Sequence, residues 1–325
     1  MRELLTSLSP SARVRYVLRF VCLAATAVVA GCDLEEITIV EIQDVVIAEI
    51  YVNLAEDPAE NEIRAFLHHT LGGLGSEVDE LPNALIVVRR SDGLTLNLVE
   101  TPLDSCLDSL PTVGSGACFL ADPAQTPNLS PGDLLEVEVT FTDGGTLFGA
   151  ARVPLSFQID GISTTCRLDP NTLLPILWSR SEGAWAYFNE TLISGLPDAL
   201  QPEGIVVEED PLHLLGLSIS DQDTTIVFPS EFGIFDRFDL DQDLSSRLQS
   251  GLPASTTAEV SITAVEGNFV NWARGGSINP SGQVRVPSLQ GDGTGVFGAT
   301  VSRRFVVVSS DQPSPLPDCP IPNGS

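Results

Sequence analysis

Apolar and polar residues alternate with a period of two along most of this chain. In the first half the alternating runs are 45–52, 84–88, 94–99, 134–141 and 146–153. Ser91-Asp92-Gly93 and Asp143-Gly144-Gly145 separate the last four runs into two pairs. Asp-Gly between alternating runs is a strong signal for a turn that joins antiparallel strands. The pattern predicts two β-hairpins that follow an early strand.

The second half continues the same pattern. Its expected strands are 174–178, 185–188, 205–207, 213–219, 225–228, 258–270 and 295–308. Two segments differ: 61–73 predicts a short helix or an irregular excursion, and 239–250 allows one short helix. The last fifteen residues carry five prolines and little periodicity, so no regular element is expected there.

These runs predict an all-β fold. Trp178, Trp185 and Tyr187 have a spacing similar to that of the core aromatics in fibronectin type III-like sandwiches. The length suits two β-sandwich domains, immunoglobulin-like or fibronectin type III-like. The expected division is 1–31, a signal peptide; 32–157 and 158–310, the two sandwiches; and 311–325, a proline-rich tail.

The N-terminus predicts a bacterial lipoprotein signal peptide. Three arginines precede an apolar run, 20–30, that is too short to span a bilayer. Small residues stand directly before Cys32, so Cys32 is expected to become the lipidated first residue and to anchor the chain to a membrane. An ordinary secretory signal that ends near a cysteine is the alternative. Both interpretations direct the chain out of the cytoplasm.

Four cysteines follow the lipidation site: Cys106, Cys118, Cys166 and Cys319. An even number in an exported chain predicts two disulfides, with three possible pairings. We favour Cys106–Cys118, which closes a short loop, and Cys166–Cys319, which would fasten the tail. Zinc binding is the alternative, although no pair of these cysteines has C-x-x-C spacing.

The chain is strongly acidic, with a formal net charge of −28 and no lysine. Nucleic acids and anionic lipid headgroups are therefore not expected as partners, because both are bound largely through lysine and arginine. The 43% of hydrophobic residues and the positive mean hydropathy argue against disorder.

One acidic run is a weak calcium candidate, and no other cofactor is expected. Asp239, Asp241 and Asp243 alternate as at the start of an EF-hand loop. The sixth position is Leu244 and the twelfth is Ser250, so the glycine and the bidentate glutamate of that loop are missing. A looser site, joined by the aspartates at 221 and 223, stays open.

Motifs for catalysis are weak. Gly293 to Gly298 matches G-x-G-x-x-G, but a strand follows it where a nucleotide site needs a helix, so the glycines predict a turn or bulge between strands. We expect His68 and His69 to be structural or exposed, and His213, in an apolar run, to be structural. A carboxylate-based hydrolase stays open because the sequence does not give the separation of two carboxylates.

Several segments together resemble the bacterial lipoprotein family called domain of unknown function 4249. The C-terminal ones are 258–272, Asn279-Pro280, Val286-Pro287 and 291–298, and 84–93, 134–154 and 178–187 look like upstream parts of that family. The resemblance implies a two-domain β-protein of the outer membrane. Such proteins are often encoded beside TonB-dependent receptors and are thought to help them capture or gate a nutrient. It carries no catalytic residues.

Three hypotheses for function result. The first is a non-enzymatic cell-envelope lipoprotein that serves as an accessory binding protein for a TonB-dependent receptor. The second is a glycan- or nutrient-binding lipoprotein in which Trp178, Trp185 or Trp272 forms an exposed stacking platform. The third is the hydrolase. We expect the outer membrane or cell surface rather than the inner membrane, although Asp33 after the lipid would favour inner-membrane retention in enteric bacteria.

Overall fold

The computed structural model describes residues 45–69, 83–106, 116–162, 164–218, 220–231, 242–274 and 286–321. They belong to one unit that begins at Asp44. The expected signal peptide and Cys32 lie outside the described residues. No helix in the described segments is long and apolar enough to cross a membrane.

Strands dominate the first half, which confirms the all-β prediction. They are β1 (Val46–Leu54), β2 (Glu62–His69), β3 (Ala84–Arg90), β4 (Thr95–Thr101), β5 (Gly116–Ala121), β6 (Leu134–Phe141) and β7 (Thr146–Arg152). Short 3-10 turns are η1 (Pro58–Glu60), η2 (Leu103–Ser105) and η3 (Thr126–Asn128). Both predicted hairpins are present, as β3–β4 and β6–β7.

The second half adds the remaining strands and the helices. Its strands are β8 (Thr165–Leu168), β9 (Leu174–Leu177), β10 (Ala186–Ser194), β11 (Leu212–Leu217), β12 (Thr225–Phe228), β13 (Thr256–Val265), β14 (Gln290–Gly291) and β15 (Thr294–Ser309). The helical segments are α2 (Leu196–Leu200), η4 (Gln201–Glu203), α3 (Gln242–Leu248) and α4 (Gly267–Arg274). The short helix expected within 239–250 is confirmed by α3.

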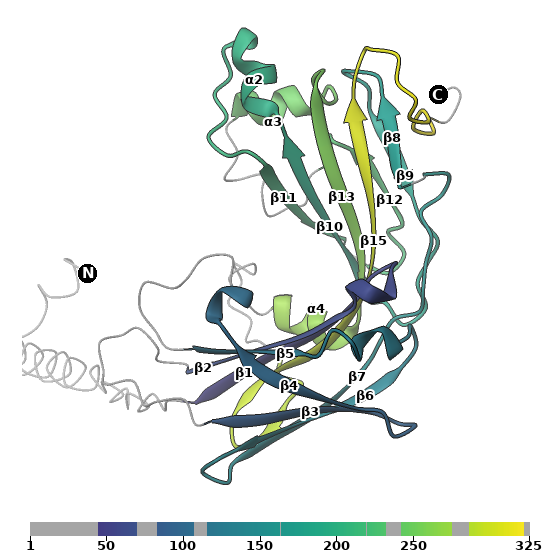
Figure 1. Ribbon diagram of the computed structural model, residues 1–325. Coiled ribbons are helices and arrows are strands. Elements are labelled where there is room, and N and C mark those ends of the chain that lie inside the picture. The colour runs from purple at the N-terminus through teal and green to yellow at the C-terminus, as the bar shows by residue number, and fades with distance from the viewer. Residues whose placement is uncertain are drawn as a thin grey trace, which may run out of the picture. The chain divides into compact units, whose positions relative to one another are not determined.

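Most strands join one large sheet in the order β11-β10-β13-β15-β1-β2-β5-β4-β3-β6-β7-β14, with β8 also beside β15. A separate small sheet pairs β12 with β9. In the first half the large sheet turns back on itself, with β1, β2 and β5 in one layer and β3, β6 and β7 in the other (Figure 1). The two layers enclose apolar side chains, as in a sandwich.

The long strand β15 connects the two halves of the sheet. Its first part pairs in parallel with β1, from Ile47 opposite Thr294 onward. Its second part pairs antiparallel with β13, as far as Thr256 opposite Ser309. Strands from both expected domains therefore belong to one sheet. The division between residues 157 and 158 stays a prediction.

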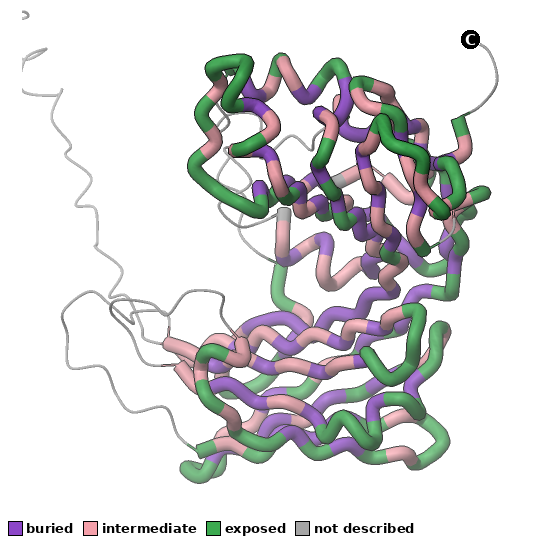
Figure 2. The backbone as a smooth tube through the Cα atoms, turned by 45° about the horizontal axis from the view of Figure 1, so that its top comes forward, coloured by how far each residue is buried: buried purple, intermediate pink, exposed green. Residues whose placement is uncertain are grey.

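The core follows from the alternation in the sequence. In β1 the side chains of Ala48, Ile50 and Val52 are fully buried, while their neighbours in the strand remain partly exposed. Figure 2 shows the same alternation of buried and more exposed positions along the strands of both layers. Each fully buried Ile or Val contributes about 1.5–3 kcal/mol, so the inward positions of one strand outweigh any single surface contact.

Two sequence predictions of local structure were wrong. Residues 62–69 form strand β2 rather than a helix, because Ile63, Ala65 and Leu67 at every second position are buried in the core. Residues 205–207 form no strand. They follow Gly204, which ends η4 in a left-handed conformation, and Val206 in their middle is 79% exposed.

The strand expected at 258–270 is shorter than predicted. It ends at Val265, and α4 begins two residues later. The carboxylate of Glu266 accepts hydrogen bonds from the backbone N–H groups of Asn268 (2.6 Å) and Phe269 (2.9 Å). These bonds satisfy two free N–H groups of the first turn and so favour a helix at this point.

The glycines of the G-x-G-x-x-G match have a structural role. Gly293 lies in the turn between β14 and β15, as expected, whereas Gly295 lies inside β15 with a φ of 142°. A Cβ at Gly295 would overlap the backbone oxygen of Ala48. Glycine here lets β15 approach β1 closely.

Both favoured disulfides are present in the structure. Cys106 is joined to Cys118, and Cys166 is joined to Cys319. The second holds the tail against β8, where the backbone N–H of Arg167 also donates to the oxygen of Pro317 at 2.8 Å. The tail is thus fixed to the sheet by a covalent bond and by backbone hydrogen bonds.

Candidate functional site

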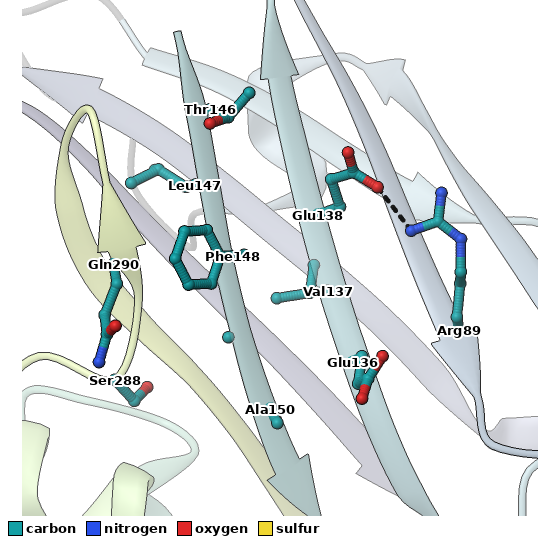
Figure 3. A pocket seen from close by; sticks show the side chains of 11 residues that line it. Arg89, Glu136, Val137, Glu138, Thr146, Leu147, Phe148, Ala150, Ser288 and Gln290 are labelled. Atoms are coloured by element: carbon teal, nitrogen blue, oxygen red, sulfur yellow. Dashed lines mark hydrogen bonds and ion pairs between the residues drawn. The ribbon is translucent and has the colours of Figure 1, made fainter.

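A groove of about 620 Å³ lies on the outer face of β3, β6 and β7 (Figure 3). It is lined by charged, polar and apolar side chains of these strands. Ser288 and Gln290, from the segment that enters β14, line it as well. Glu136, Phe148 and Ala150 in its lining are exposed to solvent.

Strand alternation places the lining residues. On β7 the side chains of Phe148 and Ala150 are exposed, while the side chain of Leu147, next to Phe148, is fully buried. In the register, Glu138 of β6 pairs with Phe148, and Phe148 pairs with Gln290 of β14. One cross-strand row therefore carries a carboxylate, an aromatic ring and an amide side by side.

Phe148 is the distinctive member of this row. Its side chain is 54% exposed, and in Figure 3 it lies between the side chains of Gln290 and Glu138. Burial of a phenyl ring lowers the free energy because apolar surface leaves water. An exposed ring among polar groups therefore provides apolar area that a ligand can bury.

An ion pair borders the groove on the β3 side. Arg89 Nη1 lies 2.6 Å from Glu138 Oε2, and both side chains are about half exposed. Pairs this exposed contribute little to the free energy of unfolding, about 0–1 kcal/mol. The pair still places a guanidinium and a carboxylate near Phe148.

The opposite border is held by hydrogen bonds of Ser288 and by a close approach to Gly149. The backbone N–H of Ser288 donates to the oxygen of Gly295 at 2.9 Å, and its Oγ accepts from the N–H of Phe297 at 2.8 Å. A Cβ at Gly149 would lie 2.9 Å from the oxygen of Ser288, so this glycine lets the segment sit against β7. The border is therefore fixed by β15 and by β7.

The groove combines an exposed ring with hydrogen-bonding side chains of both signs, an arrangement suited to non-covalent binding. Glu136 and Glu138 share one strand face, so the hydrolase alternative would use this pair. The carboxyl group whose pKa burial clearly raises is instead Glu266, which caps α4 and does not line the groove.

The three histidines lie apart from the groove. His68 stacks on Phe66, with ring centroids 5.1 Å apart, and its Nε2 is 3.9 Å from the Glu49 carboxylate. His69 ends β2. His213 lies on the exposed side of β11, not in the apolar core, because its neighbours on either side take the buried positions. It pairs with Glu190 of β10 at 2.9 Å.

The tryptophans divide into buried and exposed. Trp178 and Trp272 are 5% and 6% exposed, and Trp178 packs edge-on against Tyr187 in the core with ring centroids 5.4 Å apart. Trp185 is 57% exposed. Of the three proposed stacking platforms, Trp185 alone has the exposure that stacking requires.

Most of the calcium candidate lies outside the described residues. Asp243 is exposed in the first turn of α3, and Asp239 and Asp241 lie outside the described residues. Asp221 pairs with Arg180, and Asp223 accepts from the backbone N–H of Ser220. Across the described ranges, no three His, Cys, Asp or Glu side chains gather as metal ligands.

The groove was missed in the sequence. Phe148 stands at a position of the 146–153 run where alternation assigns a solvent-facing side chain, and an aromatic residue there is the signal that could have found it. Ser288 and Gln290 come from a part of the chain far away in sequence, so only the fold brings them to β7.

No protein-family model matches this chain, and no curated protein matches it. The resemblance to domain of unknown function 4249 stays a prediction.

Proposed function

We propose that this chain is a non-enzymatic, lipid-anchored protein of the cell envelope that binds a ligand in the Phe148 groove. In this proposal it serves as an accessory to a TonB-dependent receptor of the outer membrane and helps that receptor capture its cargo. The observation that carries the proposal is the ring of Phe148, 54% exposed between a carboxylate and an amide in a groove of about 620 Å³.

The energetics of the groove favour binding of moderate strength. Covering the exposed half of one phenyl ring contributes about 1 kcal/mol, and each hydrogen bond to a charged side chain about 1.5–3 kcal/mol. Part of this gain offsets the entropy lost on association. An accessory protein that must pass its cargo onward needs reversible binding of this kind.

The export interpretation has support from the cysteines. Two disulfides are typical of proteins that fold in an oxidising compartment, as exported proteins do. Cys32, which would carry the lipid, precedes β1 by a short stretch of sequence. The groove would therefore work close to a membrane.

A capture experiment tests the proposal. The purified mature chain is immobilised and exposed to detergent-solubilised envelopes of its own source, and the recovered proteins are identified by mass spectrometry. We expect a TonB-dependent receptor to be recovered by the native chain, to be lost with Phe148→Ala, and to be retained with Phe148→Trp, which keeps an aromatic ring. Equal recovery by the native chain and by Phe148→Ala would exclude the groove as the site of action.

The matched control is Val206→Ala, which shortens an apolar side chain that is 79% exposed outside the groove. This variant should recover the same proteins as the native chain.

A second candidate function, binding of a nutrient glycan by the protein itself, is favoured by the exposure of Trp185.

A further inference from the structure

Phe148 and Trp185 are two exposed aromatic side chains, and hydrogen bonds connect the segments that surround them. Ala150 lies two residues after Phe148 on the same face of β7, and it is also exposed and also lines the groove. The backbone oxygen of Ala150 accepts a hydrogen bond from Asn268 Nδ2 at 2.9 Å. Asn268 follows directly after Gly267, the first residue of α4.

The indole of Trp185 lies against Gly267. A Cβ on Gly267 would be 2.9 Å from Cε2 of Trp185, so the ring covers the bare backbone of this glycine. The backbone N–H of Trp185 donates to the oxygen of Val265 at 2.8 Å, which fixes the residue beside the start of α4. The indole therefore lies beside the start of α4 and remains exposed.

A second set of contacts joins the same two regions. Ser288 Oγ of the groove and Asn268 Nδ2 both approach the backbone oxygen of Phe297, at 3.4 and 3.0 Å. Hydrogen bonds to the backbone oxygens of Ala150 and Phe297 therefore connect the groove with Asn268. Asn268 follows Gly267, against which the indole of Trp185 lies.

We propose that this surface binds an extended neutral oligosaccharide, with one sugar ring stacked on Phe148 and another on Trp185. The inference rests on the proposed function, because it uses the same groove and names the class of its ligand. Aromatic rings offer flat apolar faces that match the C–H faces of pyranose rings. Glu136 and Gln290 beside Phe148 offer acceptors and donors for sugar hydroxyls.

Charge and spacing define the ligand further. Glu136 and Glu138 outnumber Arg89 in the groove and the chain has a net charge of −28, so uronic acids and sulfated sugars would be repelled. The polar groups of Ala150 and Asn268 lie between the segments that carry these two rings. A linear glycan contacts separated rings with successive sugars.

Isothermal titration calorimetry on the intact mature chain tests this assignment. The probes are cellohexaose, laminarihexaose, maltohexaose and mannohexaose, together with the disaccharide of each series. We expect at least one hexasaccharide to bind at least about tenfold more tightly than its disaccharide, since the longer chain reaches both rings. Phe148→Ala and Trp185→Ala should each weaken the hexasaccharide by about tenfold, and Trp185→Ala should remove the dependence on length.

Two further variants guard against loss of folding. Trp185→Tyr and Phe148→Tyr keep a flat ring and should restore most of the affinity, while Val206→Ala should change nothing. Hexagalacturonate, which is acidic, should bind at least about tenfold more weakly than the best neutral hexasaccharide.

The possible outcomes separate this inference from the proposed function. Absence of binding to every hexasaccharide, with receptor capture still lost in Phe148→Ala, overturns the glycan assignment and leaves the proposed function standing. A hexasaccharide that needs Phe148 but not Trp185 overturns the extended site. Equal binding of hexagalacturonate overturns the restriction to neutral sugars. Sugar binding that neither ring variant weakens, with receptor capture unaffected by Phe148→Ala, overturns both.

Discussion

At the scale of single residues, Glu266 shows how a buried charge can serve structure. Glu266 is 7% exposed, and burial raises the pKa of its carboxyl group above the usual value. Hydrogen bonds from the backbone N–H groups of Asn268 and Phe269 partly offset that effect because they stabilise the ionised form. The structural role of this carboxyl group is to cap α4.

This raised pKa predicts a pH dependence of stability. The folded chain holds the Glu266 proton more tightly than the unfolded chain, so its contribution to stability is greatest below pH 4.5 and declines as pH rises through the folded pKa. We therefore expect the free energy of unfolding of the native chain, measured in urea relative to Glu266→Gln, to fall as pH rises above 4.5. Glu100→Gln, at an exposed glutamate, is the control. A difference that stays constant from pH 4 to pH 7 would contradict the prediction.

Gly295 gives a second prediction at this scale. A Cβ there would overlap the Ala48 oxygen, and the φ of 142° is one that other residues rarely adopt. We expect Gly295→Ala to lower the free energy of unfolding by about 3 kcal/mol or more. Gly204→Ala is the matched control, because Gly204 also has a positive φ but has open space around its Cβ. It should cost only about 1 kcal/mol, and equal losses in the two variants would show that the close approach to β1 does not matter.

At the scale of elements, the sequence predicts those whose local signals agree. The hairpins β3–β4 and β6–β7 have alternation and an Asp-Gly turn, and both formed as expected. Strand β2 has no adjacent turn signal, and its small inward residue Ala65 weakens the alternation. In α4 the aromatic residues favour a strand, whereas the hydrogen bonds from the first turn to the Glu266 carboxylate favour a helix. The groove depends on pairing between β7 and β14, which no local pattern encodes.

The disulfides predict unequal effects on stability. Cys106–Cys118 spans 12 residues and Cys166–Cys319 spans 153. A longer loop loses more entropy in the unfolded chain when it is closed, so the loop-closure model gives about 3 kcal/mol for the first and about 5 kcal/mol for the second. Denaturant unfolding of the two double serine variants should show the larger loss for Cys166→Ser with Cys319→Ser. The opposite order would mean that strain or residual structure outweighs loop length.

At the scale of the whole molecule, β15 determines what can fold alone. The segment 32–157 contains β1 but lacks β15, the strand that covers one edge of β1. We expect this fragment, purified separately, to show no dispersed amide signals in an NMR spectrum, because an uncovered edge and a missing core strand remove much of its stabilisation. The full mature chain serves as the folded reference. A well-folded fragment would support the division into domains at residue 157.

Anchoring is also a property of the whole molecule. If Cys32 carries acyl chains, each buried methylene adds about 0.8 kcal/mol of membrane affinity, and several chains give stable attachment. Cys32→Ala should therefore move the protein from the membrane fraction to the soluble fraction, with both disulfides intact. Mass analysis of the native protein that shows an unmodified Cys32 would refute the anchor.

The pairing of β1 with β15 has a consequence for the time order of folding. Ile47 pairs with Thr294, so most of the chain must be synthesised before β1 can complete its pairing with β15. Chains dominated by such distant pairings have a high contact order and fold slowly. During that delay the bare edge of β1 is open to other chains. We therefore expect the emerging polypeptide to need a chaperone that shields this edge until β15 is available.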